Sequence, residues 1–221
     1  MVFRKSEGNM YPWVTHTWNV IKGKCPHDCV YCYMKRFPQG ELRFDEKEMK
    51  RNLGAGNFIF VGSSCDMFAE DISDLWIKKV LSHCYPFENK YLFQSKNPSR
   101  MWDYNILFPY DSIFGTTIES DKDYNISKAP HVFERAVGIC EFKSAGFKTI
   151  VTIEPVLDFN INTLVKIVRV ANPSWVNIGA DSKGHNLPEP SWGKVQELII
   201  ALKEFTEVKV KSNLGRLKCQ K

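Results

Sequence analysis

The segment Lys148-Thr-Ile-Val-Thr-Ile-Glu154 begins the part of the sequence that decides the fold. Its β-branched residues predict a buried strand, and Pro155 predicts the end of that strand. A set of apolar residues at helical spacing follows, namely Leu164, Ile167, Val168 and Ala171. Trp175-Val-Asn-Ile-Gly-Ala-Asp181 then predicts another strand. A strand, a helix and a strand in succession predict a βαβ unit with parallel strands.

The same alternation extends to both sides of this unit. Upstream, we expect strands at residues 13–20, 57–64, 90–96 and 112–119, and helices from about residue 73, from Asn97-Pro98 and over residues 131–145. Downstream, a helix contains Trp192, Val195, Leu198, Ile199 and Leu202, and residues 208–211 are a candidate seventh strand. A complete eight-unit barrel takes ~250 residues. The 221 residues therefore predict an α/β fold, an open, partial (βα)6 TIM-like barrel. With no linker or composition break, we expect one domain over residues 1–221.

Each predicted strand carries a polar or small row on one face, because residues two apart share a face. The rows are Gly62, Ser64 and Asp66; Gln94 and Lys96; Gly115, Thr117 and Glu119; Thr152 and Glu154; Asn177, Gly179 and Asp181; and Lys209 and Lys211. Ordinary parallel barrels are filled with aliphatic residues, and buried charges need partners. We therefore expect a polar interior that holds a ligand at the carboxyl ends of the strands. The alternative is that some rows face outward or form structural salt bridges.

Three of the seven cysteines lie within eight residues, Cys25-Pro-His-Asp-Cys29-Val-Tyr-Cys32. Three thiolates on one loop can hold three irons of a cubane [4Fe–4S] cluster, which leaves the fourth iron open to a small molecule. An open metal position is typical of reactive rather than structural sites. The alternative is a zinc site with His27 as fourth ligand. It is disfavoured because zinc sites usually take their ligand pairs from two separated segments.

This Cys-x3-Cys-x2-Cys spacing, with Tyr31 before the last cysteine, resembles the signature of the radical S-adenosylmethionine superfamily. The resemblance implies a (βα)6 core and an open iron that chelates S-adenosylmethionine. It implies reductive cleavage of that cofactor to methionine and a 5′-deoxyadenosyl radical, which abstracts hydrogen from a substrate. It also places the cofactor at the strand ends, where the expected binding residues are Tyr31, Gly62, Ser63, Ser64, Asp66, Thr117, Glu119, Ser120, Glu154 and Gly179. Gly62-Ser63-Ser64 stands where the superfamily commonly has Gly-Gly-Glu.

Further segments are similar, in order and spacing, to a small phage-associated family of radical S-adenosylmethionine proteins. They are Trp18-Asn19, residues 60–68, residues 94–98, Ile153-Glu-Pro155 and residues 179–184. That family is largely of unknown function and distantly related to spore photoproduct lyase, which repairs a thymine dimer. The resemblance implies an isomerase- or lyase-type reaction on a nucleic-acid component, such as base modification, rearrangement of a modified thymidine, or repair.

Three residues near the strand ends are candidate catalytic residues: Cys65, Lys96 and Glu119. A thiol at Cys65 could return a hydrogen atom to a product radical, although a buried cysteine is more often a small apolar residue. Lys96, like Lys211, could bind a phosphate or carboxylate of the substrate. The alternative is that these lysines pair with Glu119 or Glu154.

Basic charge is concentrated at the two ends of the sequence. Lys and Arg number 30 against 25 Asp and Glu, yet residues 1–36 and 207–221 each carry a net charge of +4. We expect docking of an acidic electron donor of the flavodoxin or ferredoxin type, or of DNA or a nucleotide. The scattered cysteines and the lack of a signal or membrane-spanning segment predict a cytoplasmic protein. The rival functions are a non-catalytic iron–sulfur electron carrier and a zinc-dependent nucleic-acid-binding module.

Overall fold

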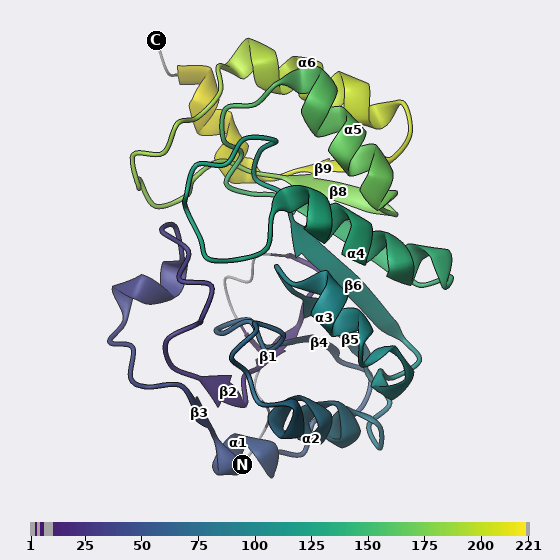
Figure 1. The fold of residues 1–221 in the computed structure, drawn as a ribbon. Helices are drawn as coiled ribbons and strands as arrows, with labels where there is room; N and C mark the ends of the chain where they lie inside the picture. The colour runs from purple at the N-terminus through teal and green to yellow at the C-terminus, as the bar shows by residue number, and fades with distance from the viewer. Residues whose placement is uncertain (1–2, 4, 7–10, 220–221) are drawn as a thin grey trace.

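The computed structural model describes residues 3, 5–6 and 11–219 and contains one large parallel sheet (Figure 1). Its strand order is β1-β4-β5-β6-β7-β8-β9, and every neighbouring pair is parallel. The strands are β1 (His16–Trp18), β4 (Phe58–Val61), β5 (Lys90–Gln94), β6 (Ser112–Thr117), β7 (Lys148–Ile153), β8 (Trp175–Ile178) and β9 (Glu207–Val210). Within the described residues β1 and β9 do not pair, so the sheet is not closed. The expected partial barrel is confirmed, and β9 is the seventh strand.

Five helices cover the outer face of this sheet (Figure 1). They are α2 (Asp74–Cys84), α3 (Pro98–Trp102), α4 (Val132–Ser144), α5 (Ile161–Ala171) and α6 (Trp192–Lys203). The capping residues follow the sequence signals. The side chain of Asn97 accepts a hydrogen bond from the Arg100 N–H, and Pro98 is the first residue of α3. Among the described helices, none has the length and apolar composition needed to cross a bilayer.

Several short elements lie outside the regular alternation. β2 (Ile21–Lys22) and β3 (Arg43–Phe44) form an antiparallel pair, and α1 (Glu46–Met49) follows β3. Three 3₁₀ segments complete the fold: η1 (Tyr33–Arg36), η2 (Asn105–Leu107) and η3 (Ser212–Cys219). The strand expected at residues 13–20 is shorter than predicted, because residues 11–14 leave the sheet and pack inside the barrel.

The barrel interior has two layers. Alternate strand residues face inward. Those toward the amino ends of the strands form an apolar floor together with Tyr11 and Val14 of the amino-terminal segment; these strand residues are Phe60, Leu92, Ile113, Ile150 and Trp175. The same face continues toward the carboxyl ends as the polar rows, so these rows do point inward. The expectation of a polar interior is thus correct only for the upper layer. The side chains of this floor are aliphatic or aromatic, and their removal from water stabilises the lower part of the barrel.

Tyr11 joins the two layers. Its ring is 1% exposed and stacks on Trp13 with 5.0 Å between ring centroids. Its hydroxyl donates to Gln94 Oε1 at 2.6 Å and lies 2.6 Å from Thr152 Oγ1. The amino-terminal segment therefore fills the barrel from below, and the polar upper layer faces the carboxyl ends of the strands.

Candidate functional site

Residues 25–32, here called the cysteine loop, lie against the carboxyl ends of the strands. The backbone of the loop pairs with the segment between β6 and α4. Val30 N–H donates to the carbonyl of Ile126 at 2.8 Å, and Lys128 N–H donates to the carbonyl of His27 at 2.7 Å. Cys25, Cys29 and Cys32 are all free thiols; Cys29 is buried and the other two are partly buried.

The donor set of this loop fits an iron–sulfur cube. Among the described residues, no three His, Cys, Asp or Glu side chains converge where a single ion could be held. In a cube each thiolate binds a different iron, so three cysteines on one loop supply three of its ligands. The hydrogen bond from Cys65 lowers the pKa of Cys25 to about 6, whereas burial raises that of Cys29 to about 11. Metal coordination deprotonates such thiols outright.

Cys65 lies beside the cysteine loop. It is 2% exposed, and its thiol hydrogen-bonds to that of Cys25. This bond to Cys25, together with burial, raises the pKa of Cys65 far above its usual range. The sequence placed Cys65 just past the second strand, and the structure adds that its thiol faces a predicted cluster ligand.

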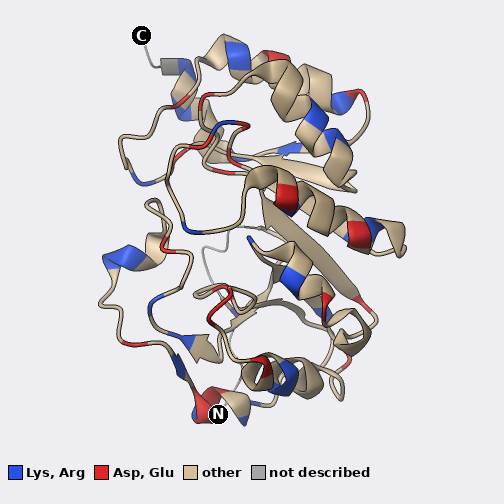
Figure 2. Cartoon of the chain, viewed as in Figure 1, with Lys and Arg blue, Asp and Glu red and all other residues tan. Residues whose placement is uncertain are grey.

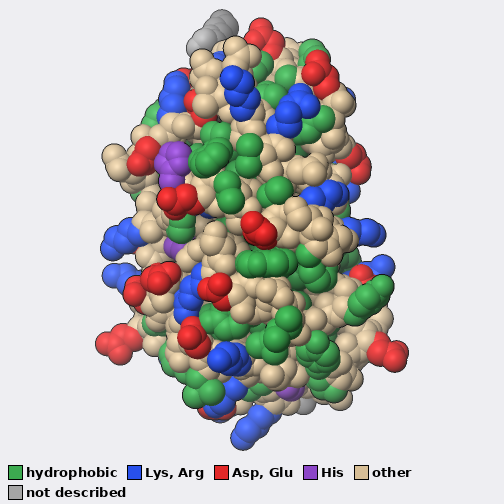
Figure 3. Space-filling view, turned by 45° about the vertical axis from the view of Figure 1, so that its right-hand side comes forward, with side chains coloured by type: hydrophobic (Ala, Val, Ile, Leu, Met, Phe, Trp, Pro, Cys, Tyr) green, Lys and Arg blue, Asp and Glu red, His purple; other side chains and the backbone are tan. Residues whose placement is uncertain are grey.

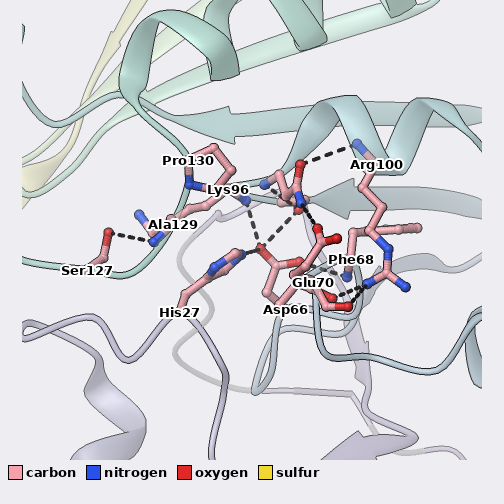
Figure 4. A network of polar contacts seen from close by, with 12 residues as sticks. His27, Asp66, Phe68, Glu70, Lys96, Arg100, Ser127, Ala129 and Pro130 are labelled. Atoms are coloured by element: carbon pink, nitrogen blue, oxygen red, sulfur yellow. Dashed lines mark hydrogen bonds and ion pairs between the residues drawn. The ribbon is translucent and has the colours of Figure 1, made fainter.

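Asp66 is the centre of a polar network that joins three segments (Figure 4). Its Oδ2 accepts from Ser95 Oγ at 3.0 Å and from Lys96 N–H at 2.8 Å, and its Oδ1 accepts from Phe68 N–H at 3.0 Å. His27 Nε2 lies 2.9 Å from Oδ2. Burial alone would raise the pKa of Asp66, but His27 and the two backbone donors outweigh it and lower the pKa.

A second network is centred on Glu119, which is 3% exposed at the end of β6. Lys96 Nζ lies 2.6 Å from Glu119 Oε1, and Arg135 Nη1 lies 2.9 Å from Oε2. The Tyr31 hydroxyl donates to Glu119 and accepts from Lys96. Burial opposes ionisation of Glu119, yet the two cations lower its pKa to about 2. The pairing of Lys96 with Glu119 is the alternative that the sequence left open.

The other interior lysine is paired in the same way. Lys211 Nζ lies 2.5 Å from Glu154 Oε2, and Asn213 Nδ2 donates to Glu154 Oε1 at 2.8 Å. Gly179 lies directly beneath this group. A Cβ on Gly179 would come within 2.8 Å of Glu154 Oε1 and 2.9 Å of Asn213 Oδ1, so a larger residue would displace the ends of these two side chains.

The remaining predicted cofactor residues lie on β4, β6 and the loops that follow them. Gly62 has φ +76°, a backbone conformation that glycine adopts at low cost. Ser64 N–H donates to Asn19 Oδ1 at 2.9 Å, and Ser63 Oγ lies 3.2 Å from the same oxygen. Within the described chain the buried Ser64 hydroxyl has no hydrogen-bond partner, a state that favours a ligand at this point.

The ends of β6 and α4 border a cavity of about 120 Å³. Glu119, Ser120 and Arg135 contribute to its lining, together with the loop over residues 122–132. Ser120 Oγ donates to the carbonyl of Asp158 at 2.7 Å, and Thr117 Oγ1 accepts from Gln94 Nε2 at 3.3 Å. The cavity thus opens beside the predicted residues of the fourth strand.

Sequence reasoning missed Arg135, Asn19 and Asn213. Arg135 lies within a helical pattern in which nothing distinguishes it from a solvent-exposed arginine. Asn213 carries no motif, and Asn19 stands out only as part of a segment that resembles the phage-associated family. Only the folded chain brings them to Glu119, Ser64 and Glu154, respectively.

Figure 2 marks the Lys and Arg residues of the two basic regions, near the cysteine loop and near the carboxyl terminus. Near the carboxyl terminus, Lys209 Nζ packs 4.2 Å from the centre of the Trp175 ring, Lys218 Nζ lies 5.0 Å from that of Trp192, and Arg216 binds Glu189. These three cations have partners within the molecule, although Arg216 and Lys218 are also exposed. Near the cysteine loop Lys24, Lys35, Arg36 and Lys128 are exposed, and Lys35 Nζ lies 2.8 Å from Asp28 Oδ1. Over the face shown in Figure 3, charged side chains of both signs are scattered among apolar ones.

No protein-family model and no curated protein matches this chain. Solved structures of spore photoproduct lyase are similar. The complex with dinucleoside spore photoproduct superposes with a TM-score of 0.66 at 11% identity, covering 95% of this chain and 78% of that one. A cysteine-to-serine mutant of the lyase gives 0.65 at 12% identity with the same coverage. A double mutant of the lyase with bound AdoMet and dinucleoside spore photoproduct gives 0.58 at 11% identity, covering 92% and 64%. At this identity the similarity shows the fold.

Proposed function

We propose that this protein is a radical S-adenosylmethionine enzyme in which Cys25, Cys29 and Cys32 bind a [4Fe–4S] cluster. The observation that carries the proposal is the placement of three free thiols on one loop at the carboxyl ends of a partial parallel barrel. The fold adds support, because it is also that of spore photoproduct lyase, for which one similar structure contains AdoMet. When bound, the cluster and S-adenosylmethionine would supply a 5′-deoxyadenosyl radical that abstracts hydrogen from the substrate.

The residues at the strand ends would bind S-adenosylmethionine. The proposed set is Tyr31, Gly62, Ser63, Ser64, Asp66, Thr117, Glu119, Ser120, Glu154 and Gly179. Two observations support it. The Ser64 hydroxyl is buried and has no partner among the described residues, and the cavity of about 120 Å³ lies beside Glu119 and Ser120. Glu119 would act with Lys96 and Arg135 as one ionic group that holds Tyr31 in place.

Cys65, Lys96 and Glu119 are the proposed catalytic residues. Cys65 is a buried thiol that hydrogen-bonds to Cys25, so a hydrogen atom on its sulfur would be close to the chemistry. Lys96 and Glu119 contact the cysteine loop because both hydrogen-bond to the hydroxyl of Tyr31. A Cys65→Ala variant should still release 5′-deoxyadenosine from S-adenosylmethionine but should fail to complete the product.

For the substrate, we propose a nucleic-acid component, and for the reductant an acidic electron donor of the flavodoxin or ferredoxin type. The first is supported by the dinucleoside in the similar lyase structures. The second is supported by exposed cations around the cysteine loop, where a donor must approach the cluster. We also propose that the reaction is of the isomerase or lyase type, as the resemblance to the phage-associated family implies.

The test is anaerobic reconstitution followed by reduction in the presence of S-adenosylmethionine. We expect about four irons and four sulfides per chain, the composition of the cubane cluster, together with release of 5′-deoxyadenosine. The triple variant C25A/C29A/C32A should show neither. A cluster without 5′-deoxyadenosine would indicate an electron carrier, and zinc without sulfide would indicate the nucleic-acid-binding module. Deuterated oligonucleotides or nucleosides identify the substrate if deuterium appears in 5′-deoxyadenosine.

A further inference from the structure

His27 lies between two of the three predicted cluster ligands and is itself buried. Its residue is 4% exposed, and its Nε2 lies 2.9 Å from Asp66 Oδ2. In Figure 4 the two side chains point toward one another from different segments of the chain. Among the described residues Nε2 makes no hydrogen bond of good geometry, so its 2.9 Å approach to this carboxylate is the polar contact that holds the buried ring.

The position of Asp66 is itself fixed by the sheet. Two of its partners are backbone N–H groups, of Lys96 just after β5 and of Phe68 after β4. The third is the Ser95 hydroxyl. The Phe68 donor lies in the turn that contains Asp66, whereas Ser95 and Lys96 directly follow β5. The carboxylate therefore connects the end of β5 to the His27 ring.

The opposite side of His27 is held through its main chain. Its carbonyl accepts from Lys128 N–H at 2.7 Å, and the neighbouring Val30 N–H donates to Ile126 at 2.8 Å. One residue is thus fixed by its ring toward β4 and β5 and by its backbone toward the segment before α4. Cys25 and Cys29 are each two residues away from it.

We propose that Asp66 and His27 form a positioning pair that orders the cysteine loop in the apo-protein, so that the Cys25 and Cys29 thiols are in place when the cluster arrives. The pair rests on the proposed function only in taking residues 25–32 as the cluster loop. Asp66 acts on the iron site through His27. Ordering the loop in advance removes an entropy cost that cluster binding would otherwise carry.

The first measurement is amide hydrogen exchange of the 25–32 segment in anaerobic apo-protein. Asp66→Asn and His27→Gln should each raise its exchange about tenfold, the effect of losing one close buried contact between the imidazole and the carboxylate. The double variant should exchange no faster than either single variant, because the two residues act as one unit. Asp45→Asn is the matched control, since Asp45 also accepts from two backbone N–H groups and one side chain but lies outside the loop.

The second measurement is the electron paramagnetic resonance spectrum of the reduced, reconstituted proteins without S-adenosylmethionine, because Asp66 is also among the proposed cofactor-binding residues. Asp66→Asn and His27→Gln should shift the signal in the same way, and Asp45→Asn should leave it unchanged. Unaltered loop exchange in folded Asp66→Asn, or additive effects in the double variant, would overturn the pair. If exchange responds as expected but no variant, wild type included, assembles a cluster, the pair stands and the proposed function fails.

Discussion

At the scale of single residues, burial decides how much each ionic contact contributes. Glu119 and Asp158 both have a pKa of about 2, but for different reasons. Glu119 is buried, and its two cations overcome the desolvation that opposes ionisation. Asp158 has a side chain 33% exposed, and hydrogen bonds from Lys122 and Lys194 lower its pKa near solvent. Solvent screening makes the second arrangement much weaker.

Replacing Glu119 by Gln should lower the free energy of unfolding by about 3 kcal/mol at pH 7, from its pKa shift and the linkage relation. The pKa is depressed from 4.5 to about 2 in the folded state, so the stabilisation is complete above pH 4.5. It is lost as the pH falls toward 2. Urea unfolding of both proteins between pH 7 and 2.5 should show a difference that shrinks below pH 4.5.

Asp158→Asn is the control for that measurement. Despite the same pKa, it should change the free energy of unfolding by less than about 1 kcal/mol, as exposed pairs do. Equal losses for the two variants would mean that burial of Glu119 is not what gives its ion pairs their strength.

The sequence predicted which residues lie at the strand ends, but it did not predict all of the side chains that they contact. The strand ends bearing Gly62, Glu119 and Glu154 follow from alternation, and the structure places all three there. That Asp66 faces His27 could not be foreseen, because the two side chains meet through a loop whose path no periodic pattern encodes. The roles assigned to these residues at the cofactor stay predictions.

At the scale of elements, the packing of α3 against α4 depends on one glycine. A Cβ at Gly138 in α4 would lie 2.7 Å from the backbone nitrogen of Ser99 and 3.1 Å from the carbonyl carbon of Pro98. Because those atoms belong to the backbone at the start of α3, they cannot move aside without shifting that helix. Glycine is needed at position 138 because the backbone of α3 approaches α4 closely there, not because the helix must be flexible.

Gly138→Ala should therefore destabilise the protein, by about 1–3 kcal/mol from overpacking, which outweighs the helix propensity gained by alanine. Gly193→Ala is the matched control in α6, where a Cβ would meet no atom within 4 Å. It should be neutral or stabilising by up to about 1 kcal/mol. Thermal unfolding of both variants checks this, and a stabilised Gly138→Ala would refute the packing argument.

Element boundaries followed from the sequence where a periodic pattern was long. α2, α4, α5 and α6 lie where apolar spacing predicts them, with end residues such as Ser73 and Asn160 that precede the first turn. β2 and β3 have two residues each, too few to show alternation, and only their pairing reveals them. η1, which directly follows Cys32, has four residues and is also too short for a periodic pattern to predict it.

At the scale of the whole molecule, the two-layered interior depends on Tyr11. Tyr11→Phe would leave Gln94 Oε1 without a donor in a buried layer and should cost about 1–2 kcal/mol. Tyr110→Phe is the control, because Tyr110 is 99% exposed and should change the free energy of unfolding by less than about 0.5 kcal/mol. A Tyr11→Phe protein as stable as wild type would show that the hydroxyl does not link the layers.

The distribution of charge predicts where partners bind. Lys24, Lys35 and Arg36 are exposed near the cysteine loop, whereas Lys78, Lys166 and Lys203 are exposed on the outer helices. Replacing the first set by Glu should slow reduction by an acidic donor about tenfold at low salt, through lost electrostatic steering. The second set, with the same change in net charge, should have little effect. Stopped-flow reduction at several ionic strengths compares them, and equal slowing by both sets would contradict a local docking face.

The hydrogen bonds that the structure describes between residues 27–30 and 126–128 are made by main-chain atoms. Substitutions at residues 126–128 keep the amides and carbonyls that form them, so this pairing tolerates changes of side chain there. The length of the connection over residues 120–131, in contrast, is constrained. One additional amino acid in the 120–131 connection would slip the register and displace a thiol by roughly the 3.8 Å between successive Cα atoms. Insertions and deletions in this connection, about 100 residues further along the chain, should therefore damage the proposed cluster site at Cys25, Cys29 and Cys32.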